Sequence, residues 1–114
     1  MNFQRIQIIG VVDGPAELIC TATGNVAHFG VVVSEQWRDP LTGERTPITT
    51  TFPCTAFGAR AGQAATVLKR GRHVFLEGRL RERRGWSITV DQFKLLDRGY
   101  VAPEDESQLT EYED

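Results

Sequence analysis

One aromatic side chain with cations close to it in the chain is the most informative feature of this sequence. Trp37 is followed directly by Arg38, and Arg45 lies on the far side of a short polar segment. A second concentration of positive charge extends from residue 69 to residue 84. A flat aromatic ring stacks on any nucleobase, and cations pair with phosphates. These residue types favour the binding of a single-stranded nucleic acid.

The basic run holds far more cations than acids. Its cations are Lys69, Arg70, Arg72, Arg79, Arg81, Arg83 and Arg84. Only Glu77 and Glu82 oppose them within the stretch. A solvated strand face is the ordinary explanation of a charge run, but a phosphate partner would relieve this excess of like charge. We predict that these seven residues contact phosphates, together with Arg38 and Arg45.

Charge is distributed unevenly along the 114 residues. All 13 Lys and Arg residues lie at or before Arg98, where nine acids oppose them, whereas residues 99–114 hold six acids and no base. We predict one domain over residues 1–98, followed by an acidic, disordered tail over residues 99–114. Three roles are open for the tail: keeping the protein in solution, docking partner proteins, or competing with nucleic acid for the basic domain.

An enzymatic role is not indicated. The sequence lacks paired carboxylates, a nucleophile beside a base, a phosphate-binding glycine loop and metal-ligand spacing, so no metal or cofactor is predicted.

Cys20 and Cys54 each stand alone in a strand-like run, which predicts a reduced, buried pair. His28 and His73 have no second ligand nearby and are interpreted as structural. The N-terminal residues lack the apolar run of a signal peptide or membrane span, so we expect a cytoplasmic, nucleoid-associated protein.

The pattern of apolar residues predicts β structure with one helix. Strands are expected over residues 3–12, 26–37, 49–57, 73–83 and 86–95, with residues 18–23 opening the second of them. A long polar loop is expected over residues 38–47, a tight turn at residues 84–85, and an edge or bulge at Pro53. The alanines after Gly58 predict the helix, which ends at residues 69–71. Alternation predicts the inward-facing residues Phe29, Val31, Val33, Val74, Leu76, Leu80, Ile88 and Val90.

The predicted order is three strands, a helix and two further strands. This is the arrangement of an OB-fold, a five-stranded Greek-key barrel that commonly binds oligonucleotides. An SH3-like barrel has a similar number of strands, but the helix between strands 3 and 4 favours the OB-fold.

Several stretches of the chain carry a resemblance to a known family. They are residues 24–29 (GNVAHF), 34–39 (SEQWRD), 55–58 (TAFG), 68–71 (LKRG) and 74–81 (VFLEGRLR). In this order and spacing they resemble the bacterial single-stranded DNA-binding protein family. The match extends over about residues 3–96.

The resemblance implies a homo-oligomer of OB-folds, a tetramer or a dimer, that coats single-stranded DNA without sequence preference during replication, recombination and repair. The base-stacking aromatics of the family fall here on Trp37, Phe57 and Trp86. A further aromatic of the family falls on Thr51, and Phe52, the next residue, is the remaining candidate for stacking.

The chain departs from the family at other places as well. Pro53 replaces a usual basic residue, and the hairpin at residues 84–85 is short. The family docks replication and repair proteins through a tail that ends in Pro-Phe, whereas this chain ends at residues 111–114 with Glu-Tyr-Glu-Asp. A phage, plasmid or otherwise divergent member fits this pattern.

Alternative roles are open for the aromatic residues. Each could pack within the protein instead of stacking on a base. Trp37 falls on the same face of its strand as Val33 and would extend the core. Phe57 would pack beneath the helix, and Trp86 would cap the barrel. In that case an OB-fold interaction module, such as an accessory subunit of a primosome or conjugation complex, is the alternative function. RNA binding is a third, because stacking and phosphate contacts do not exclude a 2′-hydroxyl.

Overall fold

The computed structural model describes residues 1–97, which form six strands and one helix. The strands are β1 (Ile6–Val12), β2 (Glu17–Thr21), β3 (Gly24–Arg38), β4 (Arg45–Phe57), β5 (His73–Glu82) and β6 (Trp86–Leu95). The helix α1 (Ala59–Val67) lies between β4 and β5 in the sequence. The expected tail over residues 99–114 lies outside the described residues.

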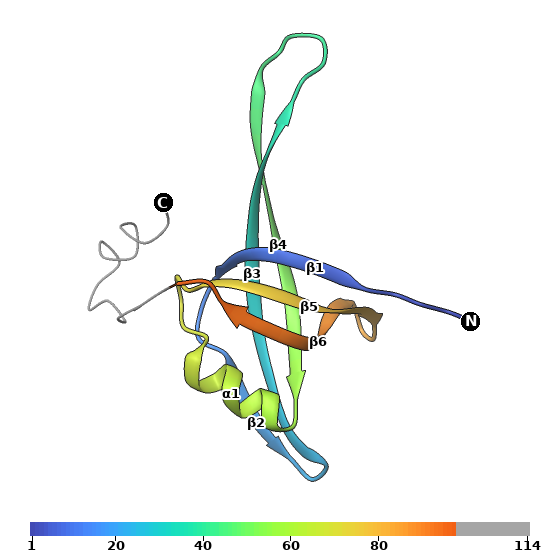
Figure 1. Ribbon diagram of the computed structural model, residues 1–114, viewed down its shortest axis with the longest axis vertical. Helices are drawn as coiled ribbons and strands as arrows, with labels where there is room; N and C mark the ends of the chain where they lie inside the picture. Colours follow the sequence, from blue (N-terminus) through green and yellow to red (C-terminus); the bar gives the residue numbers. More distant parts are fainter. Residues whose placement is uncertain (98–114) are drawn as a thin grey trace.

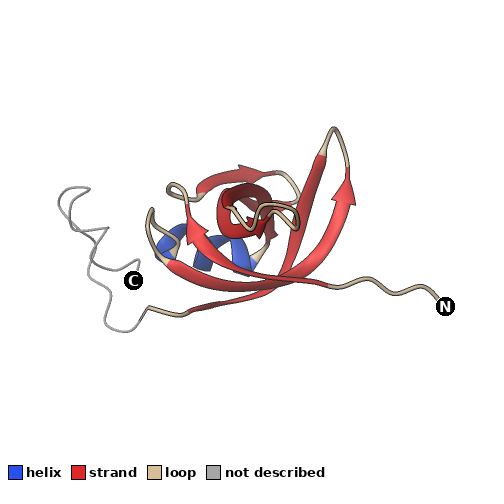
Figure 2. Ribbon diagram, turned by 90° about the horizontal axis from the view of Figure 1, so that it is seen from above, coloured by secondary structure: helices blue, strands red, loops and turns tan. Residues whose placement is uncertain are grey.

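Five of the strands close into a barrel. The sheet runs in the order β1-β5-β6-β4-β3-β2, and β1 also pairs with β3, which joins the two sides (Figure 1). Four of the barrel contacts are antiparallel, and the fifth is a short parallel contact between β4 and β6. Figure 2 shows the strands curving round one another with α1 packed on one side. The predicted OB-fold, with its helix between the third and fourth barrel strands, is confirmed.

The prediction for the segment before β3 was wrong in one respect. Residues 17–21 do not open β3 but form a strand of their own, β2, which pairs antiparallel with the first residues of β3. The chain reverses between Thr21 and Gly24, and the glycine has a φ of +130°. The two residues in the turn are Ala22 and Thr23, neither of which is a strong turn signal, so the reversal was not visible in the sequence.

The core is built from alternate residues of the barrel strands, as predicted. Phe29 and Val31 of β3, Val74 and Leu76 of β5, and Ile88 and Val90 of β6 are buried. Val33 and Leu80 are half-buried because they lie toward the ends of the barrel. From α1, Ala61 and Ala64 complete the core, and their small side chains let the helix approach the strands closely.

Two glycines allow the strands to bend into the barrel. A Cβ on Gly10 of β1 would overlap the carbonyl oxygen of Val32, and one on Gly78 of β5 would overlap that of Thr89. Gly78 lies at the β-bulge between β5 and β6. Glycine in a strand marks such points of close backbone approach.

The β3–β4 hairpin extends well beyond the barrel (Figure 1). The two strands stay paired as far as Arg38 and Arg45, so the loop spans only residues 39–44 and the prediction of a loop over residues 38–47 was too long. Pro47 pairs with Gln36 inside this ribbon. A two-stranded ribbon has two free edges, so a proline that lacks the N–H donor is tolerated there.

Candidate nucleic-acid interface

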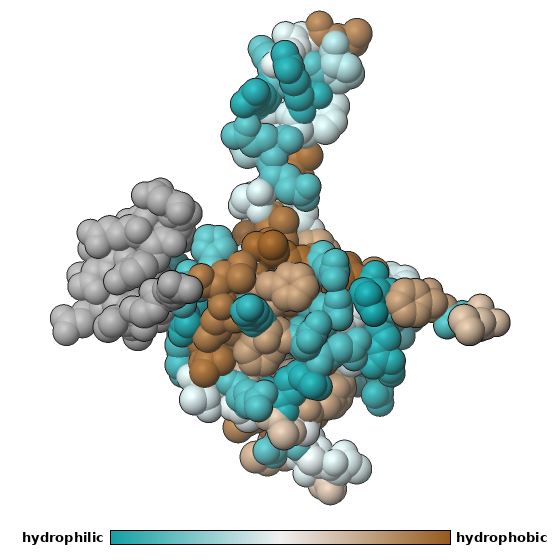
Figure 3. Space-filling view, in the orientation of Figure 1, coloured by the Kyte–Doolittle hydropathy of each residue, from teal (hydrophilic) through white to brown (hydrophobic). Residues whose placement is uncertain are grey.

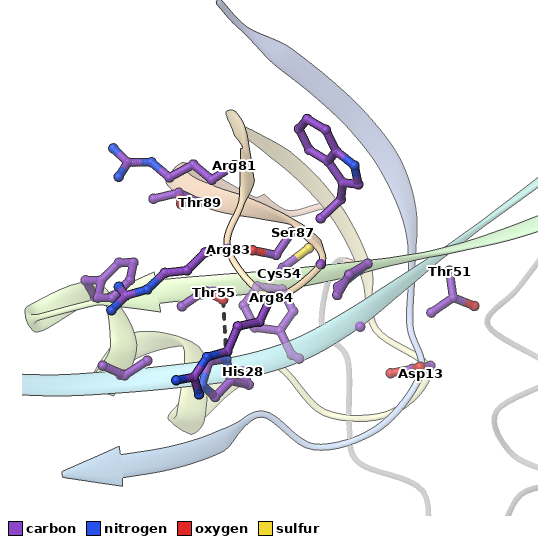
Figure 4. Close-up of a pocket in the computed structure, with 17 residues that line it drawn as sticks. Asp13, His28, Thr51, Cys54, Thr55, Arg81, Arg83, Arg84, Ser87 and Thr89 are labelled. Carbon is purple, nitrogen blue, oxygen red and sulfur yellow. Dashed lines mark hydrogen bonds between the residues drawn. The ribbon is translucent and has the colours of Figure 1, made fainter. Parts of the chain in front are cut away.

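A groove of about 960 Å³ opens on the barrel surface where β3 and β4 meet the turn between β5 and β6 (Figure 4). Its floor is formed by outward-facing residues of β3 and β4, and one wall by the turn. The groove contains both of the features that the sequence suggested for binding, aromatic rings and arginines.

Two of the predicted stacking residues line this groove and are exposed. Phe57 is the last residue of β4 and is 51% exposed, because strand alternation turns it away from the buried Ala56. Trp86 is the first residue of β6 and is 63% exposed. It shares its parity with Ile88, but it lies beyond the point where the barrel interior ends. Neither ring is buried in the core or beneath the helix.

Three of the predicted phosphate contacts belong to the same groove. They are Arg81, near the end of β5, and Arg83 and Arg84, in the turn that follows it. Arg83 N donates a hydrogen bond to Gly85 O (2.9 Å), which closes the turn. Arg84 has a φ of 59°, and it is the only residue other than glycine within residues 1–97 that adopts a positive φ.

The other cations of the basic run do not line the groove. Arg79 is exposed on β5 and forms an ion pair with Asp91 (3.1 Å). Lys69 donates a hydrogen bond to Ala65 O (3.3 Å), and Arg70 is exposed in the loop before β5. Arg72 is half-buried and pairs with the carboxylate of Asp97. These residues are close in sequence but not in space. The ten residues of β5 lie between the two ends of the basic run, and a strand of that length spans roughly 30 Å.

Arg72 belongs to a cluster that anchors the end of the described chain. Its Nε lies 3.4 Å from Oδ2 of Asp97, whose side chain is 10% exposed. The same carboxylate accepts a hydrogen bond from His73 N (2.5 Å), and Leu96 N donates to His73 O (2.9 Å). The Nδ1 of His73 lies 3.9 Å from Oδ1 of Asp97, so the geometry favours a structural role for Arg72 and is compatible with the one expected of His73.

A second set of predicted residues lies on the projecting hairpin. Trp37 is 50% exposed and pairs across the ribbon with Thr46. Arg38 and Arg45 are directly opposite each other at the end of the ribbon. Like charges in this position repel each other, which an anionic partner would relieve. None of the three lines the groove, so the aromatic and basic residues form two surfaces.

Phe52 differs from the other stacking candidates. It is half-buried and packs against the core cluster. Its ring is less accessible than those of Trp37, Phe57 and Trp86. The ring is therefore less suited to stacking on a base than the three exposed rings.

The groove also contains polar residues that the sequence did not indicate. His28 was interpreted as structural, but it is exposed in the groove and its Nδ1 lies 3.3 Å from Oγ1 of Thr55. Thr51, Ser87 and Thr89 line the groove as well. All lie on the outward-facing positions that alternate with the core, and this alternation is the one signal that could have identified them.

The cysteines are both free thiols, but only one is buried. Cys54 lies beneath the groove, and burial, followed by the nearby charge of Asp13, raises the pKa of its thiol to about 12. Cys20 is exposed on β2. The prediction of a buried pair was wrong for Cys20, because β2 lies at the edge of the sheet and all its residues are exposed.

Within residues 1–97, no group of three or more metal-ligating side chains comes together. No helix in this part of the chain is long and apolar enough to span a membrane.

Comparison with known proteins identifies the family and the fold. The solved structure described as the Plasmodium falciparum SSB complex with ssDNA is 21% identical with a TM-score of 0.76, and the match covers 85% of this chain and 97% of that one. The small single-stranded DNA-binding protein from Streptomyces coelicolor is 24% identical with a TM-score of 0.66, covering 83% and 94% of the two chains. A deletion mutant of the single-stranded DNA binding protein from Thermus aquaticus is 15% identical with a TM-score of 0.73, covering 83% and 51%. The model of the single-strand binding protein family matches residues 3–92, and the chain therefore belongs to that family.

Proposed function

We propose that this protein binds and protects single-stranded DNA with little dependence on sequence. The observation that carries the proposal is the groove in which exposed Phe57 and Trp86 lie beside Arg81, Arg83 and Arg84. Family membership supports it, and agrees with binding rather than catalysis. Replication, recombination and repair in the cytoplasm are the settings in which such a protein acts.

The mechanism uses two kinds of contact that do not depend on base identity. Each base stacked on an aromatic ring contributes about 1–3 kcal/mol. Each neutralised phosphate releases counterions and steepens the dependence of log affinity on log salt concentration by roughly 0.7 for single strands. The groove supplies both kinds of contact on the barrel, and Trp37 with Arg38 and Arg45 supplies both on the hairpin.

We propose that the DNA contacts these two surfaces in succession. The hairpin projects from the barrel, so a strand that lies in the groove and reaches Trp37 must follow β3 and β4 outward (Figure 1). This path makes the minimum length of bound DNA depend on both surfaces. An oligonucleotide that is long enough only for the groove will be insensitive to substitution of Trp37.

We further propose that the protein forms a homo-oligomer through the outer face of β1 and β5. Ile9 of β1 is 58% exposed and pairs across the strands with Phe75, which is half-buried. Figure 3 shows an apolar region over these strands. A second copy would remove this surface from water, and sedimentation equilibrium would measure the stoichiometry.

The test is a fluorescence titration with oligo-dT, oligo-dA, the matching duplex and an RNA oligomer at two salt concentrations. The protein has only two tryptophans, so Trp37→Phe leaves Trp86 as the reporter of the groove and Trp86→Phe leaves Trp37 as the reporter of the hairpin. We expect single strands to quench both reporters and high salt to weaken binding. Absence of quenching and binding would indicate instead that the aromatic rings serve a protein partner.

The alanine variant tests whether stacking on the hairpin depends on sequence. Trp37→Ala is expected to weaken binding to long oligo-dT and oligo-dA about equally, by roughly 5- to 150-fold, since one stacking contact is lost. The half-exposed ring contributes little to the core, so thermal stability should change little. A loss confined to one of the two oligonucleotides would contradict sequence-independent stacking.

A further inference from the structure

One acidic residue lines the groove that is otherwise suited to an anion. Asp13 follows directly after β1 and is exposed. Figure 4 shows it at one end of the groove, apart from Arg81, Arg83 and Arg84. The groove therefore has a basic end and an acidic end.

Backbone hydrogen bonds hold the chain at Asp13 beside β3, and its carboxylate lies against Gly30. Asp13 N donates a hydrogen bond to Gly30 O (3.1 Å), and the preceding residue, Val12, donates to Arg72 O (2.9 Å). The carboxylate lies directly against Gly30: a Cβ on this glycine would be 2.6 Å from Oδ2 and 2.7 Å from Oδ1. Glycine at position 30 thus leaves the space that the carboxylate fills, on the floor of the groove beside Pro53.

The carboxylate oxygens have no partner in the described part of the chain. No donor or cation among residues 1–97 is in hydrogen-bond or ion-pair contact with them. Their charge contributes to the raised pKa of the Cys54 thiol, which places them near the groove floor. The oxygens are consequently free to accept hydrogen bonds from a molecule in the groove.

Phosphates and bases respond differently to such a group. Like charge repels a phosphate from Asp13, whereas the arginines attract it to the other end of the groove. A strand in the groove therefore directs a base edge, rather than its backbone, toward the carboxylate. A carboxylate accepts hydrogen bonds from exocyclic amino groups, as in contacts of Asp and Glu with cytosine N4.

We propose that Asp13 selects for bases that carry an exocyclic amino group, that is cytosine, adenine and guanine, over thymine and uracil. The inference rests on the proposed binding of single-stranded DNA in the groove. Thymine and uracil offer only N3–H, which lies between two carbonyl oxygens that repel the carboxylate. Asp13 contacts a base at only one position in the groove. The stacking contacts at the other positions still accept any base.

The experiment compares two homopolymers that are alike in ring size. Short oligo-dC and oligo-dU fill the groove, and they differ in the group at C4 and the proton at N3. We expect Asp13→Ala to lower the ratio of dC affinity to dU affinity by about fivefold or more, which corresponds to the lower limit for readout by a side chain. Glu17→Ala is the matched control, since it removes an exposed acid of β2 that does not line the groove.

A second variant and a change of salt make the test decisive. Asp13→Asn keeps the size of the side chain and can pair with either base, so it should lower the ratio as well, and an unfolding curve for each variant verifies the fold. In the wild-type protein the ratio of dC affinity to dU affinity should persist at high salt, because salt screens the repulsion between charges but does not remove hydrogen bonds. Equal tightening of dC and dU in both Asp13 variants would overturn the inference, because Asp13 would then only repel phosphates. Failure of the wild-type protein to bind any oligonucleotide would overturn the proposed function, and this inference with it.

Discussion

Replacing Arg84 by glycine should change stability and binding in opposite directions. Arg84 has a φ of 59° in the turn between β5 and β6, and its side chain lines the groove. Residues with a Cβ avoid this left-handed conformation, whereas glycine adopts it freely. A sequence selected for stability alone would place glycine or asparagine at this position. We therefore predict that the arginine is present for the phosphate that its side chain would bind in the groove.

The size of each effect follows from the geometry. Relief of the left-handed conformation is worth about 1–2 kcal/mol, and the greater freedom of glycine in the unfolded chain offsets about 0.4–1 kcal/mol of it. The net gain of roughly 0.5–1 kcal/mol should raise Tm by about 2–8 °C in a domain of this size. Loss of a charge-assisted contact with phosphate should weaken binding at low salt by at least about tenfold. The slope of log affinity against log salt should become shallower by roughly 0.7.

Two measurements on the same protein preparation test the prediction. Thermal unfolding gives the change in Tm, and titration with oligo-dT at four salt concentrations gives the slope. Arg83→Ala is the matched control, since Arg83 lines the same groove without a positive φ. This control should lose affinity without gaining stability. If Arg84→Gly binds as tightly as the wild-type protein, or if its Tm falls, the explanation of the strained turn is wrong.

Two further predictions concern the barrel itself. Cys54 keeps its proton in the folded state up to a pKa of about 12 but loses it near 9.0 when unfolded, so stability falls as pH rises above 9.0. The fall between pH 8 and pH 10 should be about 1.4 kcal/mol larger than in Cys54→Ala, as measured by urea unfolding; equal slopes would contradict the burial of this thiol. Gly78→Ala should destabilise the protein by about 1–3 kcal/mol, because the new Cβ overlaps Thr89 O. Gly62→Ala in α1 has open space and should instead stabilise by roughly 0.5–1 kcal/mol, and the same unfolding assay compares the two.

Much of the barrel could be predicted because strand alternation is a local property. Phe29 and Val31, or Val74 and Leu76, stand two residues apart and so face the same side of a strand whatever its partners are, and all four are buried. Strand pairing is not local in the same way. The separate strand β2 is not predictable from its turn, which lacks glycine and proline at the central positions. Pro47 favours a loop when considered alone, and only its pairing with Gln36 shows that it belongs to a two-stranded ribbon.

The candidate site was predictable only in part, for a related reason. The family resemblance indicated Phe57 and Trp86, whereas alternation alone gave Trp86 the inward parity of Ile88; both lie at strand ends where the barrel interior no longer covers them. The basic run is continuous in sequence but not in space, because β5 separates its beginning from its end and Arg72 pairs with Asp97. Asp13 comes into the groove only because β1 crosses to Gly30 of β3, a contact between distant parts of the chain.

The way in which the barrel closes also determines when the chain can fold during synthesis. β1 pairs with β5, and β4 with β6, so neither side of the barrel is complete until residues 73–95 have left the ribosome. At an elongation rate of about 5–20 residues per second, roughly 2–8 s pass between the end of β4 and the end of β6. During that interval β1, β3 and β4 can pair with one another, but the edges that β5 and β6 occupy in the finished barrel still lack their partners. The last strand to be made, β6, is thus the one that closes the barrel between β5 and β4.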